Sequence, residues 1–481
     1  MELAPEPSGS SEPPEHHFPV TRLAGVAAFC MFCELPAVNS ILWLKTTLPT
    51  CGFRHSRTQM SGKPDAIEVE AGEVDMMERA DSKSPGMSLP GTIATLSNVL
   101  VGGSSVLLPY AFQLSGWCFG PLVLAVGSLM GFTLWIMGFL LESLDERAEQ
   151  MGIPRSQRDW GLIGYAAFGN VGRVAFAGCM FVDLIGSALF LLSVAIEQLP
   201  FLLPLKHELV AVLCCLVAFG CCLIPKRFFS AMAALGIASQ VILVVGILAT
   251  GTELSFTTGA ASDQLLFKAA GIPPAVGIAL LCFLAHSEAP LIYQMMADRT
   301  KWTKAVIYSM SVAETFLLLF GGLGYVFFGG SVGQSIAVNI GRDLDLQLLP
   351  GSWHICLGAI TIVGLSTKQL MTLPLVLDAT GDLFGEMLQW KGRILMKAIV
   401  LAISGVTAVL LKDGVAFIGD LVGILPANAV CLIFPCAAML QIRGHEMCLW
   451  QRLGVRVVAV VSTLYSVLGS AYIILQQVGA L

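Results

Sequence analysis

Charged side chains are scarce in this sequence. Asp, Glu, Lys and Arg make up 12% of the 481 residues, about half the fraction usual in soluble domains, whereas 56% of the residues are hydrophobic. The mean hydropathy is +0.78, and apolar stretches recur from about residue 92 onwards, so most of the chain must lie in lipid. These features exclude an ordinary soluble enzyme and predict an all-α, multi-pass integral membrane protein.

Several other signatures are also missing. A net charge of -6 leaves no excess of cations to neutralise phosphates, so nucleic-acid binding is not expected. The sequence assembles no nucleophile with a base and an orienting acid, and it contains no GxxxxGK[ST] loop, which argues against an enzyme and against an ATP-driven pump. Most of the 14 cysteines lie in apolar runs, where a thiol behaves as a small hydrophobe, so neither a disulfide framework nor a metal site is expected.

The polar residues that are present divide the chain into two parts. Residues 1–90 are predicted to form a cytoplasmic, largely disordered N-terminal tail, because they are Pro- and Ser-rich at first and polar and acidic over 61–83. Residues 91–481 are predicted to form a transmembrane domain of about eleven helices. Charged or Gly/Pro-rich breaks bound the expected spans at 92–115, 119–142, 171–197, 208–224, 229–250, 272–296, 305–328, 353–377, 394–411, 414–441 and 455–476.

Basic residues are unequally shared between alternate loops, which predicts the orientation. One side holds Arg147, Arg155, Arg158, Arg173, Lys226, Arg227, Arg299, Lys301, Lys304, Lys391, Arg393, Lys397, Arg443, Arg452 and Arg456, and the other side holds Lys206, Lys268, Arg342 and Lys412. Because cytoplasmic loops carry the excess of Lys and Arg, the first side and the N-terminus are expected to be cytoplasmic.

Two of the expected spans are poor continuous helices. The first contains Gly102, Gly103, Ser104 and Ser105 and is closed by a proline, while the sixth is interrupted around Ala285, His286, Ser287 and Pro290. Small residues in one such segment would usually mean close helix packing. Interruptions in both the first and the sixth span instead favour an inverted repeat of five plus five helices, in which free backbone groups of the two breaks bind substrate near the midplane.

At these residues the sequence resembles the amino acid/auxin permease family, which includes sodium-coupled neutral amino acid transporters and vacuolar amino acid transporters. The family's first-helix pattern S-N-x-x-x-G-x-G-x-L-x-x-P-Y is matched by Ser97, Asn98, Gly102, Pro109 and Tyr110, although Ser104 replaces its second glycine and Val106 its leucine. The sixth-helix pattern H-P-E-x-x-P-I-Y is matched by His286, Glu288, Ile292 and Tyr293, with Ser287 for the first proline and Pro290 one residue early. The resemblance runs from about residue 91 to 475.

This resemblance implies a LeuT-type fold and secondary active transport of amino acids, with neutral ones expected, by alternating access. It places a candidate substrate site on Gly102, Gly103, Ser104, Ser105, Ala285, His286 and Ser287. In the sodium-coupled branch an asparagine of the first helix and a threonine of the eighth are associated with the cation, and they correspond to Asn98 and Thr372. Both offer the neutral oxygen ligands that a hard cation accepts. No cofactor is expected beyond a coupling ion, H⁺ or Na⁺.

Lys368 complicates the assignment of a sodium site. It lies in the eighth expected span, four residues before Thr372, and so shares a helix face with it. Burying a lysine inside a membrane costs free energy, and such a residue usually has a functional role. Its charge could occupy the place of a sodium ion, or it could pair with an intramembrane acid such as Asp183, Glu288 or Glu314. The first reading favours proton over sodium coupling.

A second class of function also fits the sequence. A non-transporting amino acid sensor or scaffold could use the same pocket and signal through the N-terminal tail. In either case the expected partners are a small amino acid and the lipid bilayer, in a plasma membrane or a vacuolar or lysosomal membrane.

Overall fold

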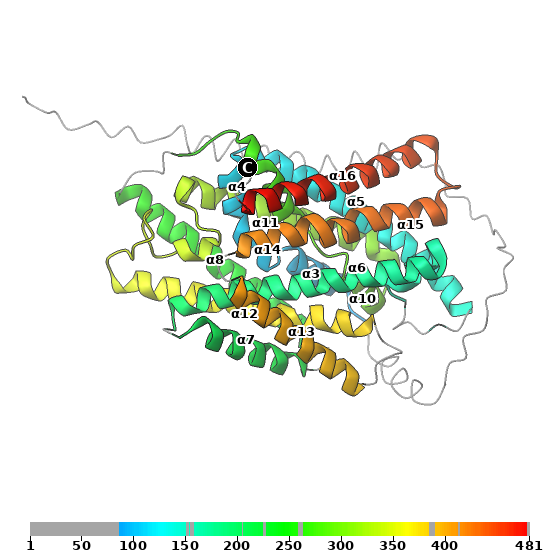
Figure 1. Ribbon diagram of the computed structural model, residues 1–481, viewed down its shortest axis with the longest axis horizontal. Coiled ribbons are helices and arrows are strands. Elements are labelled where there is room, and N and C mark those ends of the chain that lie inside the picture. The colour runs from blue at the N-terminus through cyan, green and yellow to red at the C-terminus, as the bar shows by residue number, and fades with distance from the viewer. Residues whose placement is uncertain are drawn as a thin grey trace, which may run out of the picture.

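The computed structural model is a bundle of helices that run mostly along its long axis (Figure 1). It describes residues 86–478 except 151–152, 154–157, 204, 225–227, 258–262, 384–389 and 412–413. Nearly all of the N-terminal tail expected from the sequence lies outside the described residues.

The helices fall into two consecutive sets, each of which opens with an interrupted helix. The first set consists of α3 (Leu89–Leu100) with α4 (Leu108–Ser115), α5 (Phe119–Gln150), α6 (Trp160–Gln198), α7 (His207–Cys222) and α8 (Phe229–Thr257). The second consists of α9 (Ile272–Cys282) with α10 (Ala289–Met295), α11 (Trp302–Phe328), α12 (Ser352–Asp382), α13 (Trp390–Leu410) and α14 (Val415–Val422) with α15 (Phe434–Arg443). A further helix, α16 (Leu449–Gln477), follows the second set.

The membrane spans agree with the sequence in kind and nearly in number. Within the part of the chain that the structure describes, nine helical segments are long and apolar enough to cross a membrane. The two remaining expected spans coincide with shorter apolar helices at His207–Cys222 and Ala269–Cys282, the second of which is cut short by its break.

Each interruption follows from its local sequence. α3 ends at Leu100, and Gly102 precedes a 3₁₀ turn, Gly103–Leu107, that leads into α4. α9 ends at Cys282, and the chain restarts as a helix at Ala289. Both restarts have a proline, Pro109 and Pro290, in the first turn, where its missing N–H costs nothing and its fixed φ suits a helix. The sequence therefore encodes a half-helix start in the middle of each segment.

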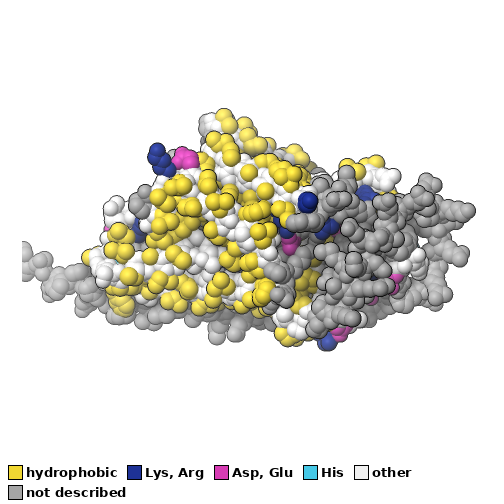
Figure 2. Space-filling view, turned by 90° about the horizontal axis from the view of Figure 1, so that it is seen from below, with side chains coloured by type: hydrophobic (Ala, Val, Ile, Leu, Met, Phe, Trp, Pro, Cys, Tyr) yellow, Lys and Arg dark blue, Asp and Glu magenta, His cyan; other side chains and the backbone are white. Residues whose placement is uncertain are grey.

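The outer surface is apolar, as a lipid-facing surface must be. Figure 2, seen from the side of α7 and α13, shows hydrophobic side chains spread over most of that face. The exposed members on these two helices include Leu209, Val212, Leu213, Leu216, Val217, Leu395, Ile399, Ile403, Val406 and Leu410. Inside, α11 packs on α3, α4 and α5, whereas α12 packs on α6, α8 and α13. The two breaks are enclosed between these groups of helices.

Candidate functional site

Two polar side chains and one backbone carbonyl, from three other helices, contact the first break. Gln369 of α12 donates through Nε2 to the Gly103 carbonyl at 3.2 Å, and a Cβ on Gly103 would collide with this side chain. The Ser104 hydroxyl donates to the Leu281 carbonyl at the end of α9, at 3.5 Å. Ser105 Oγ and Gln240 Oε1 of α8 are 3.3 Å apart. The break is thus joined to α8, α9 and α12 through its backbone and its two serines.

The three residues predicted for the ion site, Asn98, Lys368 and Thr372, lie together with Gly236, and we call these four residues the lysine cluster. Lys368 is 1% exposed, and its Nζ donates to the Asn98 carbonyl at 2.9 Å and also to the Asn98 side-chain oxygen. Thr372 donates to the Lys368 carbonyl of its own helix at 2.9 Å. Gly236 of α8 lies over the pair, since a Cβ there would meet Asn98 Oδ1 at 2.8 Å. Among the described residues Lys368 makes no ion pair with a carboxylate.

The second break is held by its histidine. His286 is fully buried, its Nε2 lies 3.0 Å from the Thr133 hydroxyl of α5, and its carbonyl accepts from Trp160 Nε1 of α6 at 2.9 Å. The Thr133 hydroxyl also lies 3.0 Å from the Met130 carbonyl, so its one proton serves either that carbonyl or the imidazole, and the contact fits either neutral tautomer of His286.

Two carboxyls accompany this break. Ser287 donates its hydroxyl to Asp183 Oδ2 of α6, and Glu288 precedes α10. Asp183 is 0% exposed and Glu288 is 5% exposed. We call Asp183, His286, Ser287 and Glu288 the acid cluster. Ala285, beside it, is also fully buried.

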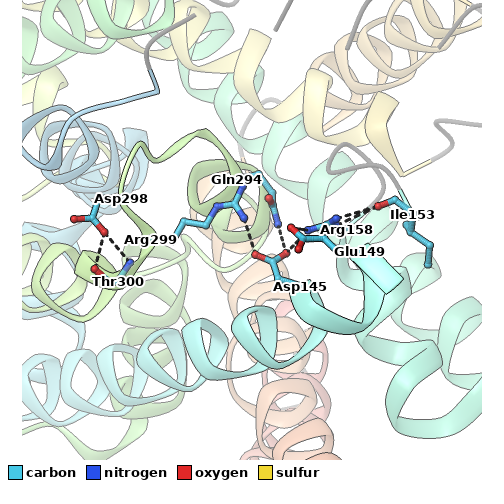
Figure 3. A network of polar contacts seen from close by, with 8 residues as sticks. All are labelled: Asp145, Glu149, Ile153, Arg158, Gln294, Asp298, Arg299 and Thr300. Carbon is cyan, nitrogen blue, oxygen red and sulfur yellow. Dashed lines mark hydrogen bonds and ion pairs between the residues drawn. The ribbon is translucent and has the colours of Figure 1, made fainter. Parts of the chain in front are cut away.

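An ionic network closes one end of the bundle, the end at which α3 begins and α5 finishes; we call it the N-side end. Figure 3 shows Asp145 of α5 between two arginines: its Oδ1 lies 3.0 Å from Arg158, just before α6, and its Oδ2 lies 2.6 Å from Arg299, just after α10. Gln294 of α10 adds a 3.3 Å hydrogen bond, and Arg158 also donates to the Ile153 carbonyl. One carboxylate therefore joins α5, the start of α6 and the end of α10.

The start of α3 is tied to the same end. The Met87 N–H donates to the Met295 carbonyl at 2.7 Å, and the Ala297 N–H donates to the Met87 carbonyl at 3.0 Å. Gly86 lies so close to Ala297 that a Cβ would meet the Ala297 backbone at 2.8 Å. Because the two interrupted helices are joined here, a displacement of α10 would pull on the start of α3.

Sequence comparison decides what kind of protein carries this site. The family described as "Transmembrane amino acid transporter protein" matches residues 86–478, which covers both breaks and all the helices described above. The chain belongs to this family. It is 24% identical over 377 residues to the Arabidopsis thaliana amino acid transporter AVT1J, covering 74% of this chain and 82% of that protein. It is 22% identical to the amino acid transporter ANT1 of the same plant, covering 78% of this chain and 90% of ANT1.

Solved structures confirm the fold. A Na⁺-coupled sialic acid symporter superposes with a TM-score of 0.53 at 12% identity, covering 94% of this chain and 95% of the symporter. A mutant of the Eremococcus coleocola manganese transporter gives a TM-score of 0.58 at 14% identity, covering 87% and 91% of the two chains. The LeuT-type architecture with broken first and sixth helices, predicted from the sequence, is therefore confirmed. The family moves amino acids across membranes and is not enzymatic, as expected.

The sequence analysis located the breaks but missed several of their partners. Gln240, Gln369, Trp160, Thr133 and Gly236 contact the breaks or the lysine cluster and were not singled out. Two of them carried a usable signal, since glutamines inside apolar spans are rare and tend to bind other helices. The other three are too ordinary in a membrane helix to be recognised without the structure.

Proposed function

We propose that this protein is a secondary active transporter that moves neutral amino acids across a membrane by alternating access and is driven by protons. The observation that carries the proposal is the position of Lys368. Its ammonium binds both oxygens of Asn98, the ones that a sodium ion would use. A lysine side chain at that point supports transport without sodium.

Substrate binding is proposed to use the two breaks. In the closed arrangement, the Gly103 and Leu281 carbonyls accept hydrogen bonds from Gln369 and Ser104. An amino acid ammonium could replace these donors, and the N–H groups at half-helix starts suit its carboxylate. The unpaired positive charge of Lys368 nearby disfavours a cationic side chain on the substrate, which supports neutral specificity.

Closure of the N-side end supports alternating access. Asp145 of α5 contacts Arg158 just before α6 and Arg299 just after α10. Release of substrate at that end therefore requires these two contacts to break. The buried breaks and the intact network together correspond to a state closed at the N-side end.

The test is uptake of a radiolabelled mixture of neutral amino acids into proteoliposomes under an imposed proton or sodium gradient. We compare wild type with Lys368→Met and with Lys304→Met, a change at an exposed lysine of α11. Proton-driven uptake that is lost only in Lys368→Met supports the proposal. Sodium-driven uptake that survives Lys368→Met would assign Asn98 and Thr372 to sodium instead. Binding without flux would favour a sensor.

A further inference from the structure

The acid cluster is not explained by substrate binding alone. Asp183 Oδ1, Glu288 Oε2 and His286 Nδ1 are all buried, and none has a hydrogen-bond partner among the residues described. Native structures leave few buried polar atoms unsatisfied, and each calls for an explanation such as a catalytic role or an unrecorded ion. Two of these atoms lie within three consecutive positions of one break, 286–288, and the third lies on the neighbouring α6, so together they point to a ligand that binds there.

The charges in the cluster restrict what that ligand can be. Asp183 and Glu288 interact electrostatically, and neither forms an ion pair with Lys or Arg in the part of the chain that is described. The other titratable groups that face them are His286, Cys179 of α6 and Cys431, which lies against the backbone of the break. None of these supplies a permanent positive charge. Simultaneous ionisation of two buried carboxylates in each other's field is unfavourable, so the pair binds a proton while it is enclosed and can release it when it opens to water.

The side chains around these unpaired atoms do not form the set of ligands that a metal ion needs. The described residues contain no group of three or more His, Cys, Asp and Glu side chains arranged to hold a metal. Ser287 already donates its hydroxyl to Asp183 Oδ2, so this oxygen is occupied. The free Oδ1 and the free Oε2 suit a proton, which needs one acceptor at a time.

We propose that Asp183 and Glu288 form the proton-binding site of the transport cycle. One proton binds a carboxylate oxygen of the pair from the side of higher proton concentration, and the same proton leaves to the other side after the substrate. This inference rests on the proposed proton-driven transport and adds the groups that carry the proton.

Geometry explains how the proton would be coupled to the substrate. Asp183 belongs to α6, whereas Ser287 and Glu288 belong to the break that lies in the candidate substrate site. The hydrogen bond that the Ser287 hydroxyl donates is stronger when Asp183 is ionised, so protonation of Asp183 weakens the link between α6 and the break. Substrate and proton occupancy therefore act on the same few backbone residues.

The experiment separates net transport from exchange in proteoliposomes. Asp183→Asn and Glu288→Gln imitate the neutral carboxyl and cannot release a proton. We expect both variants to exchange labelled for unlabelled amino acid at equal pH, while losing accumulation driven by a pH gradient. In the wild type a gradient of about one pH unit supports an accumulation of about ten-fold, since each unit is worth about 1.4 kcal/mol.

Asp420→Asn is the matched control. Asp420 of α14 is also buried with an unpaired Oδ1, but its electrostatic neighbours are Tyr110 and Tyr465 rather than the acid cluster. It should retain proton-driven accumulation. If a neutral variant loses exchange as well, Asp183→Glu and Glu288→Asp keep a titratable group and should restore accumulation.

Each outcome decides the matter. Proton-driven accumulation that persists in both neutral variants overturns the inference, and so does failure of the carboxylate-retaining variants to restore it. Wild-type accumulation driven by sodium alone would instead refute the proposed proton coupling, and absence of wild-type exchange would refute transport. Failure of the inference is thus distinct from failure of the proposed function.

Discussion

Replacing Asp145 by Asn should loosen the N-side end of the bundle. The substitution preserves the shape of the side chain and one acceptor oxygen, but it removes the negative charge that faces Arg158 and Arg299. Since these contacts join α5, the start of α6 and the end of α10, their loss should favour opening of α10 away from its neighbours.

The magnitude can be worked from the contacts. Asp145 is 15% exposed, Arg158 is 5% and Arg299 is 18%, and the two N–O distances are 3.0 and 2.6 Å. Hydrogen bonds to charged groups contribute about 1.5–3 kcal/mol each. Partial exposure screens both pairs, and the Asn carbonyl retains part of one. We therefore expect the free energy of opening to fall by about 2 kcal/mol, which is about a 30-fold change in an equilibrium constant.

Hydrogen exchange in lipid nanodiscs measures this opening directly. Backbone amides in 289–301 should exchange about 30-fold faster in Asp145→Asn than in wild type, because exchange of protected amides reports the local opening equilibrium. Asp298→Asn is the control: its carboxylate lies in the same turn and pairs with Lys301 at 3.0 Å, but both side chains are more than 40% exposed. Exposed pairs contribute little.

Equal exchange in the two variants would refute this reasoning. It would mean that the arginines find other acceptors, such as Glu149, which lies 3.5 Å from Arg158. Faster exchange spread evenly over all the helices would also refute it, since that pattern reports global unfolding rather than opening of the N-side end.

Two further predictions concern stability. Gly423→Ala should lower the melting temperature in detergent, because its Cβ would collide with the Gly277 backbone and such overpacking costs about 1–3 kcal/mol of stability. Gly454 has open space around it, so Gly454→Ala should not lower the melting temperature. Burial raises the pKa of Asp159 from its ordinary 3.8 to about 6, against the lowering effect of its bond from the Leu162 N–H. The folded state thus binds the proton more tightly, and ionised Asp159 costs stability as the pH rises from about 4 to 6. The melting temperature of Asp159→Asn should therefore be higher than that of the wild type at pH 7 and no higher at pH 4.

The architecture could be predicted because its determinants are local in sequence. Gly102 to Pro109 and Ala285 to Pro290 disrupt helices by their own composition, and lipid excludes any spanning structure other than helices or barrels here. Helix ends were harder. The third span was expected to begin at 171, and α6 is kinked at Phe168 and Gly169, so its main part begins close to that position. The additional helical segment that starts at Trp160, capped by Asp159, was not expected, and Gly169, with a φ of 65°, separates it from the main part.

The site could be predicted only in part, because pairing across helices depends on how each helix is rotated. Spacing placed Lys368 and Thr372 on one face, yet the Thr372 hydroxyl turns back to the Lys368 carbonyl. Hydroxyls in helices commonly donate to the carbonyl four residues back, and the oxygen can still accept a hydrogen bond or a cation in that orientation. The choice of Asn98 as the partner of Lys368, rather than an acid, likewise required the packing of α8 against both α12 and α3.

The fold's internal repeat relates the two polar clusters. α6 is the third helical element of the first set and α12 is the third of the second set, so they occupy equivalent places. Lys368 of α12 reaches the break of the first set, and Asp183 of α6 reaches the break of the second. Each half therefore extends a titratable side chain to the interrupted segment of the other half: Lys368 contacts Asn98 in the last turn before the first break, and Asp183 contacts the Ser287 hydroxyl within the second break.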